Sequence, residues 1–193
     1  MMTIGLTGGI GSGKSVVASL LEIYGMPVYA ADEESKHLVV SSPFIRKRLT
    51  AILGDSIYDS GGLNRRLMAS LIFNDAKLLE QVNAVIHPEV SRHFRSWIER
   101  QTAKYAVLES AILFESNFDR HVDFCLMVYA PRELRIKRVM MRDQITEAEV
   151  LQRMQHQLPD EEKKERADYV IYNDEKQSLI PQIERLIQFF NYL

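Results

Sequence analysis

The feature that most constrains the fold is the segment from residue 8 to residue 15, which reads Gly-Gly-Ile-Gly-Ser-Gly-Lys-Ser. It matches the pattern GxxxxGK[ST], follows a short apolar run at residues 3–7, and precedes apolar residues at helical spacing. Glycines permit the dihedral angles and the close approach that let successive backbone N–H groups surround phosphate oxygens. The following helix presents the positive end of its dipole to the same anion. The sequence therefore predicts a strand, a phosphate-binding loop (P-loop) and a helix.

The residue types within this loop indicate a nucleoside triphosphate. Lys14 has the length to reach the β- and γ-phosphates, and the hydroxyl of Ser15 is a suitable Mg²⁺ ligand. A glycine-rich hairpin with an incidental lysine is the alternative, but it does not explain the strand before the loop and the helix after it. We therefore expect ATP and Mg²⁺ as cofactors. The predicted ATP contacts are Gly11, Ser12, Gly13, Lys14, Ser15 and Val16.

Short apolar runs alternate with helical patterns along the chain. The runs predict strands near residues 3–7, 28–31, 105–109, 124–129 and 169–172. Five apolar strands separated by helices predict an α/β fold of the P-loop NTPase type, with an open parallel five-stranded sheet flanked by helices.

Between residues 33 and 103 the pattern is almost wholly helical. We expect four helices there, with the third ending near His87-Pro88 because proline disfavours a helical residue before it. Asn64 is the predicted cap of the second helix. The helical run interrupts the strand–helix alternation, which indicates an inserted subdomain.

Three parts are therefore expected. Residues 1–32, 104–131 and 167–193 form a nucleotide-binding core, residues 33–103 a helical substrate-binding subdomain, and residues 132–166 a helical lid. Thr146 and Glu149 have the spacing of a capping box inside the lid.

Composition limits the compartment and the partners. The chain has 193 residues, 46% of them hydrophobic and 26% charged, and a net charge of only −2. Such a chain is typical of a soluble globular protein, and we expect no nucleic-acid or membrane partner. The P-loop starts too close to Met1 for a signal peptide, and no apolar run is long enough to span a bilayer. Cys125, the single cysteine, lies in an apolar run, so we interpret it as a buried thiol in a strand and expect a cytoplasmic protein.

A P-loop also occurs in switch GTPases and motor ATPases. The guanine-reading pattern Asn-Lys-x-Asp does not occur in the sequence, and Asp59 to Gly62 matches the loose pattern DxxG without a strand before it. We interpret that glycine pair as a turn. A kinase fits the remaining features better.

Asp32 is the candidate catalytic base of such a kinase. It lies at the end of the second predicted strand, where ligands bind in open α/β sheets, and its carboxylate suits the proton of an attacking hydroxyl. The alternative is that Asp32 only caps a helix beginning at Glu33.

Three arginines, Arg135, Arg138 and Arg142, are spaced to share one face of a helix in the lid. Forked guanidinium groups suit phosphate oxygens and the charge that develops in phosphoryl transfer. We interpret Arg138 and Arg142 as catalytic together with Lys14 and Asp32. A solvated basic face is the alternative.

Acceptor contacts are harder to assign. Arg65 and His87 lie in the helical insertion, and Glu109 ends the third predicted strand, so these residues and Asp32 are the predicted substrate contacts. Glu109 also suits a role in orienting Mg²⁺-bound water, and Glu115 is a weaker candidate for the same role. A histidine before proline equally often only bonds a helix end.

Taken in order, these segments resemble the dephospho-coenzyme A kinase family along nearly the whole chain. The resemblance is carried by residues 6–15, Ala31-Asp32, Arg65-Arg66 with Ile72-Phe73, residues 83–88, residues 113–115, Arg138 with Arg142-Asp143, Arg153-Met154 with Gln157, and residues 167–171 with Asn173. The resemblance implies ATP-dependent phosphorylation of the ribose 3′-hydroxyl of dephospho-coenzyme A (dephospho-CoA), giving coenzyme A and ADP.

The sequence departs from the family pattern at three positions. Val16 replaces a threonine, Ala30 replaces the first aspartate of Asp-Ala-Asp, and Ala111 replaces a proline. Asp32 and Ser15 are retained. A kinase for another small molecule and a nucleotide-dependent switch remain the alternative functions.

Overall fold

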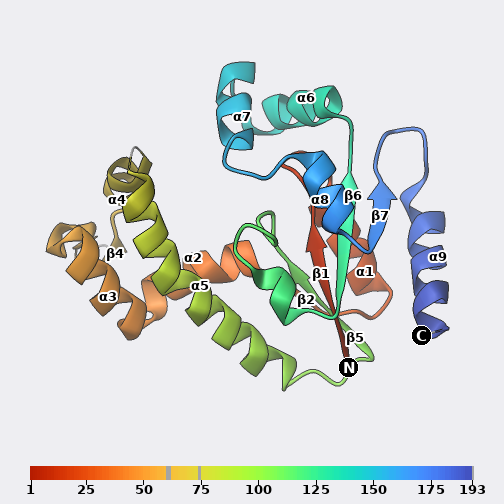
Figure 1. Cartoon of the computed structure of the whole chain (residues 1–193), viewed down its shortest axis with the longest axis horizontal. Coiled ribbons are helices and arrows are strands. Elements are labelled where there is room, and N and C mark those ends of the chain that lie inside the picture. The colour runs from red at the N-terminus through yellow and green to blue at the C-terminus, as the bar shows by residue number, and fades with distance from the viewer. Residues whose placement is uncertain (60–61, 74, 193) are drawn as a thin grey trace. The chain divides into compact units, whose positions relative to one another are not determined.

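The computed structural model describes residues 1–59, 62–73 and 75–192. The chain forms two compact units (Figure 1). One consists of Met1–Ala30 and Gln101–Leu193, and the other of Ala31–Arg100. None of the helices in the described part of the chain combines the length and apolar character that a membrane span requires.

The first unit is built on a five-stranded sheet in which every pairing is parallel. Its strands lie in the order β2-β5-β1-β6-β7. They are β1 (Met2–Thr7), β2 (Val28–Ala30), β5 (Tyr105–Glu109), β6 (Phe124–Tyr129) and β7 (Tyr169–Tyr172). This confirms the predicted sheet, with β2 one residue shorter than expected.

The central position of β1 creates the crevice in which ligands bind in such sheets. The chain leaves β1 toward β2 at one edge and later places β6 on the other side of β1. The loop after β1 therefore lies at a topological switch point, at the carboxyl ends of the strands.

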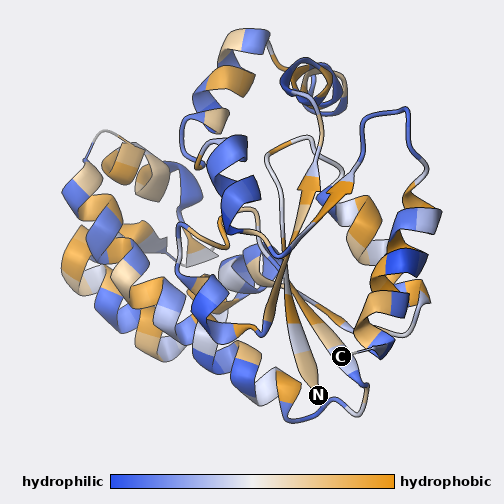
Figure 2. Ribbon diagram, turned by 45° about the vertical axis from the view of Figure 1, so that its right-hand side comes forward, coloured by the Kyte–Doolittle hydropathy of each residue, from blue (hydrophilic) through white to orange (hydrophobic). Residues whose placement is uncertain are grey.

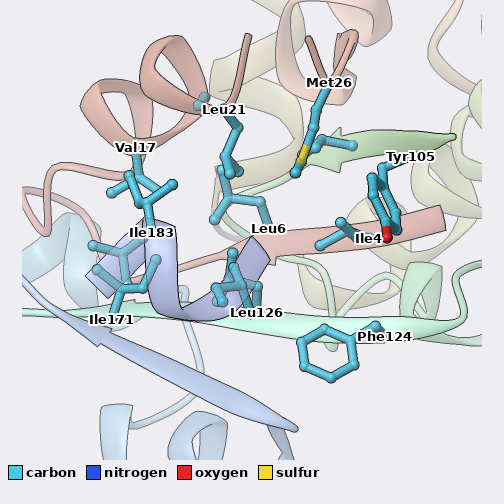
Figure 3. Packing of buried hydrophobic residues seen from close by; sticks show 14 of the residues in the cluster. Ile4, Leu6, Val17, Leu21, Met26, Tyr105, Phe124, Leu126, Ile171 and Ile183 are labelled. Carbon is cyan, nitrogen blue, oxygen red and sulfur yellow. The ribbon is translucent and has the colours of Figure 1, made fainter. Parts of the chain in front are cut away.

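One face of the sheet is covered by α1 (Lys14–Ile23) and α9 (Leu179–Asn191). Val17 and Leu21 of α1 point toward the strands, close to Leu6 and Ile183 (Figure 3). The strands themselves are largely hydrophobic (Figure 2), as expected for a parallel sheet buried on both faces. This cluster fixes α1, and therefore the loop that precedes it, on the sheet.

On the other side of the sheet, the strands contact the segment around Leu113 and helix α8 (Asp160–Arg166). A side chain at Gly5 would meet Leu113 Cδ2 at 2.8 Å. The short helix η2 (Phe118–His121) follows Leu113, and α8 packs against β6. Cys125 is a buried free thiol in β6, as predicted, and burial raises its pKa to about 11, with the negative charge of Asp168 adding to the effect.

The segment from 132 to 166 forms three helices: α6 (Arg132–Asp143), α7 (Glu147–Met154) and α8. The predicted capping box is confirmed, because Thr146 Oγ1 accepts from the N–H of Glu149 while the Glu149 carboxylate accepts from the N–H of Thr146. Helix α8 was not predicted. Its seven residues are all charged and only Lys163 is buried, so it has no apolar periodicity.

The second unit contains α2 (Ala31–Ser41), α3 (Pro43–Leu53), η1 (Asp55–Ile57), β3 (Tyr58–Asp59), β4 (Gly62–Leu63), α4 (Arg65–Phe73) and α5 (Ala76–Ile98). The predicted cap at Asn64 is confirmed by a 3.0 Å bond from the N–H of Leu67. Strands β3 and β4 pair antiparallel. Residues 60 and 61 of the predicted turn lie outside the described residues.

The prediction of a helix end near His87-Pro88 was wrong. Helix α5 is 23 residues long and continues through Pro88. Its buried positions keep one helical spacing on both sides of the proline, from Val82 through Val90 to Phe94, and this face packs against α2 and α3. Continuous tertiary packing thus offsets the helix-breaking effect of the proline, which is about 3 kcal/mol.

The exposed position of Pro88 makes this cost measurable. Pro88→Ala restores an N–H that can donate to the carbonyl of Ala84 and removes the ring clash. We expect the free energy of unfolding in urea to rise by about 1–2 kcal/mol, because the lost rigidity of proline in the unfolded chain offsets part of the gain. Gln81→Ala, on an exposed part of the same helix, should leave stability unchanged within about 0.5 kcal/mol. Equal or lower stability of Pro88→Ala would show that the proline ring contributes to packing.

Candidate active site

The loop between β1 and α1 has the backbone geometry of an anion-binding turn. Gly11 and Gly13 have φ angles of +80° and +88°, in the left-handed region that favours glycine. Gly13 directly precedes α1, so this helix presents its N-terminus to the loop. The N–H of Ser12 donates to the carbonyl of Gly9 at 2.9 Å and closes the turn. Residues 8–15 therefore have the backbone geometry that a phosphate-binding loop requires.

Asn173, directly after β7, contacts this loop. Its Nδ2 donates to the carbonyl of Ser12 at 2.8 Å. A side chain at Gly13 would collide with the same Nδ2. Gly13 is thus required both by its φ angle and by the approach of β7.

Lys14 is oriented by Glu109. Nζ of Lys14 lies 2.5 Å from Oε1 of Glu109, and both side chains are largely buried. Glu109 is the last residue of β5 and pairs with Leu6 of β1 in the sheet register. Sequence reasoning assigned Glu109 to the substrate or to metal-bound water, whereas the geometry gives it a direct contact with the P-loop lysine.

Asp32 lies in the first turn of α2, because this helix begins at Ala31 and not at Glu33. It is therefore not an N-cap of a helix beginning at Glu33. Asp32 follows Ala30 by two residues, and Ala30 pairs with Glu109 in the sheet. In the sequence Asp32 thus follows the carboxyl end of β2 by two residues.

Arg135, Arg138 and Arg142 of α6 have three different environments. Arg138 donates to the carbonyl of Asn173 at 3.2 Å and pairs with Glu175 at 3.2 Å. Arg142 is mostly exposed and pairs with Asp143 at 2.7 Å. Arg135 is buried and pairs with Asp160. Common spacing on one helix therefore does not give these side chains a common partner.

Glu115, the weaker metal candidate, is held by other groups. Its Oε1 accepts from the N–H of Leu158 at 2.7 Å and lies 2.8 Å from Nζ of Lys163. Lys163 is fully buried and also donates to the carbonyl of Ala111 at 2.8 Å. Sequence reasoning missed Lys163 because it lies in a run of charged residues, where a solvated side chain is the usual outcome.

The predicted acceptor contacts Arg65 and His87 lie in the other compact unit, the first at the start of α4 and the second within α5. Burial lowers the pKa of His87, which favours the neutral imidazole.

The protein offers a metal ion at the loop few ligands of its own. Among the described residues no group of three or more His, Cys, Asp or Glu side chains is arranged to hold a metal ion. Ser15 is the second residue of α1, beside the loop. This suits a cation that keeps most of its water and phosphate ligands, as Mg²⁺ does.

Comparison with known proteins gives a consistent result. A family model described as dephospho-CoA kinase matches residues 2–178. A dephospho-CoA kinase of Bacteroides fragilis is 49% identical over 96% of this chain and 91% of its own length. One from Porphyromonas gingivalis is 42% identical over 97% and 94%. The crystal structure of TT1252 from Thermus thermophilus matches with a TM-score of 0.84 at 35% identity, covering 99% of this chain and 96% of that one.

Variants of the buried pair of Lys163 and Glu115 test whether Glu115 stabilises the fold or contributes to a metal site. Lys163→Met leaves the carboxylate of Glu115 without its cation, so we expect a loss of about 3–5 kcal/mol in urea unfolding. Lys163→Met combined with Glu115→Gln should recover much of this, because glutamine still accepts from Leu158. The Mg²⁺ dependence of activity should stay unchanged in the double variant. A shift of that titration to higher Mg²⁺ would instead support Glu115 as a contributor to the metal site.

Proposed function

This chain belongs to the dephospho-CoA kinase family, and we infer that it transfers the terminal phosphoryl group of ATP to the ribose 3′-hydroxyl of dephospho-CoA. The products are coenzyme A and ADP, so the reaction completes coenzyme A biosynthesis. One observation carries this inference from the molecule itself. The loop of residues 8–15, with its left-handed glycines and Lys14 at the helix N-terminus, lies in a chain that matches the family over residues 2–178.

Electrostatic stabilisation by the P-loop supplies most of the catalysis in this proposal. The phosphate contacts come from Gly11, Ser12, Gly13, Lys14, Ser15 and Val16. Lys14 neutralises charge on the β- and γ-phosphates as the bond to the leaving oxygen lengthens. The contact with Glu109 holds the Lys14 ammonium in place before the nucleotide binds. Little reorganisation is then needed during the reaction.

The divalent ion is proposed to be Mg²⁺, held by the Ser15 hydroxyl together with phosphate oxygens. When bound, such an ion neutralises negative charge on the phosphates. The place of Ser15 in the first turn of α1, beside the loop, supports this choice, since Mg²⁺ is typically bound through one or two protein ligands and substrate phosphates.

Asp32 is the proposed general base. Its carboxylate accepts a hydrogen bond from the acceptor hydroxyl, aims the hydroxyl oxygen at the γ-phosphorus, and takes the proton late in the transfer. Its place two residues beyond Ala30, the sheet partner of Glu109, supports this role. The reaction requires little covalent assistance, so orientation is the main contribution.

The remaining roles concern substrate retention. We assign residues 31–100 to acceptor binding, with Arg65 and His87 as contacts, and the segment 132–166 to a lid. Arg138 and Arg142 then stabilise charge on the phosphates after the lid closes, which requires them to exchange their present carboxylate partners for phosphate oxygens. We place the enzyme in the cytoplasm, where ATP is available, with small molecules as its partners.

Measuring ADP formation against a panel of acceptors tests the activity. Dephospho-CoA should stimulate ADP formation strongly, whereas AMP, adenosine and shikimate should not. Lys14→Ala should reduce kcat at least about tenfold, because a lost charged contact is worth at least ~1.4 kcal/mol. Lys36→Ala, at an exposed lysine outside the loop, is the matched control. Equal basal hydrolysis with every acceptor would contradict the kinase function.

Asp32→Asn separates a base from a structural carboxylate. Asparagine keeps the shape of the side chain, so folding and ATP affinity by calorimetry should stay near wild type. The value of kcat should fall by roughly 10²–10⁴, the usual range for loss of a general base. Glu33→Gln, in the same helical turn, should retain activity. Near-normal turnover of Asp32→Asn would rule out Asp32 as the base.

A further inference from the structure

Arg135 contacts the P-loop directly, unlike the two arginines that share its helix face. Its side chain is only 7% exposed and pairs with Asp160 of α8. Its Nη1 also donates to the carbonyl of Ile10 at 3.3 Å. Arg138 and Arg142 instead bond residues outside the loop.

The glycines of the loop show how closely Arg135 packs. A side chain at Gly9 would collide with the Arg135 guanidinium and approach the Asp160 carboxylate. A Cβ at Gly11 would lie 2.5 Å from the backbone oxygen of Arg135. Helix α6 and the start of α8 therefore pack so closely that neither Gly9 nor Gly11 has space for a side chain.

Gln157 bonds the backbone N–H of Ile10, the residue whose carbonyl accepts from Arg135. Its Oε1 accepts from the N–H of Ile10 at 2.9 Å, and its Nε2 donates to the carbonyl of Ala111 at 3.2 Å. Both backbone polar groups of Ile10 are thus bonded by side chains of the segment 132–166. The segment after Gln157 is itself anchored, because the N–H of Leu158 donates to Glu115.

The Asp160 carboxylate compensates the charge of the buried Arg135 guanidinium beside the loop. Burial lowers the pKa of Arg135 and raises the pKa of Asp160, and in each case the opposite charge of the partner counteracts the effect. Removal of one partner leaves an uncompensated buried charge. The pair is therefore close to neutral as a unit, and it acts on the loop through hydrogen bonding and packing.

We propose that Arg135 is a positioning residue: held by Asp160, it orders residues 9–11 of the P-loop for the phosphates of ATP before the nucleotide binds. The proposal rests on the kinase function proposed above. A loop that is already ordered avoids the conformational entropy loss that binding otherwise requires. Loss of Arg135 therefore weakens nucleotide affinity and has little effect on the chemistry of bound ATP.

The test uses the full chain and separates KM from kcat. Arg135→Gln should raise KM for ATP and the calorimetric Kd for ADP about tenfold, because the buried Asp160 carboxylate loses its charged hydrogen-bond partner and no longer holds the side chain at position 135 against the loop. The values of kcat and of KM for dephospho-CoA should stay within about twofold. Arg135→Gln with Asp160→Asn should recover most of the affinity, because glutamine can still donate to Ile10 and neither charge remains unpaired. Arg166→Gln, at an α8 arginine that pairs with Asp119 and not with the P-loop, is the matched control.

Two results would overturn the proposal. A purely structural role would lower the unfolding temperature and the active fraction but leave KM for ATP and Kd for ADP unchanged. A fall in kcat with unchanged nucleotide affinity would place Arg135 in the transfer step itself. If Arg135→Gln does not fold, Asp160→Asn carries the same test, since it releases the Arg135 guanidinium from its partner. Failure of the kinase function would be distinct, because the wild-type enzyme would then form no ADP in response to dephospho-CoA.

Discussion

The absence of side chains at the P-loop glycines is the constraint on which the rest of the site depends. A Cβ at Gly8 would lie 2.6 Å from the backbone of Val128 in β6, and one at Gly9 would collide with Arg135. At Gly13 it would collide with Asn173 after β7. The strand ends and α6 can therefore approach the loop backbone directly. This contact positions the loop on the sheet, and it leaves the backbone N–H groups and the α1 dipole as the means of binding phosphate.

Charge around the loop is arranged in local pairs, which agrees with a net charge of only −2. Lys14 is paired with Glu109, and Arg135 with Asp160. The two pairs have different roles in the proposals above. Glu109 holds the Lys14 ammonium in place for the phosphates. Arg135 keeps its contacts with Asp160 and with the carbonyl of Ile10, and through them it orders the loop.

Two differences between the sequence predictions and the structure concern helices α5 and α8. Pro88 was expected to end a helix because local propensity disfavours a helix there, yet the apolar face of α5 continues across it and packs against α2 and α3. Helix α8 was not expected because its seven residues are all charged, yet Lys163 is buried and contacts Glu115 and the carbonyl of Ala111. At Pro88 tertiary packing outweighs the local preference, whereas in α8 the helix-forming Glu, Lys and Arg residues lack only the apolar periodicity that would have indicated a packed helix.

The sequence alone determined the strand–loop–helix unit, the five parallel strands and the family. These depend on local patterns, such as apolar runs, glycine spacing and caps, that a short window of sequence contains. Tertiary structure alone decided which charged side chains meet. Gln157 and Ile10 are bonded across 147 positions, and Arg135, Arg138 and Arg142 of α6 have three different partners. Such pairs follow from the packing of α6 and α8 on the loop, because an ion pair needs only proximity in space and leaves no periodic signal in the sequence.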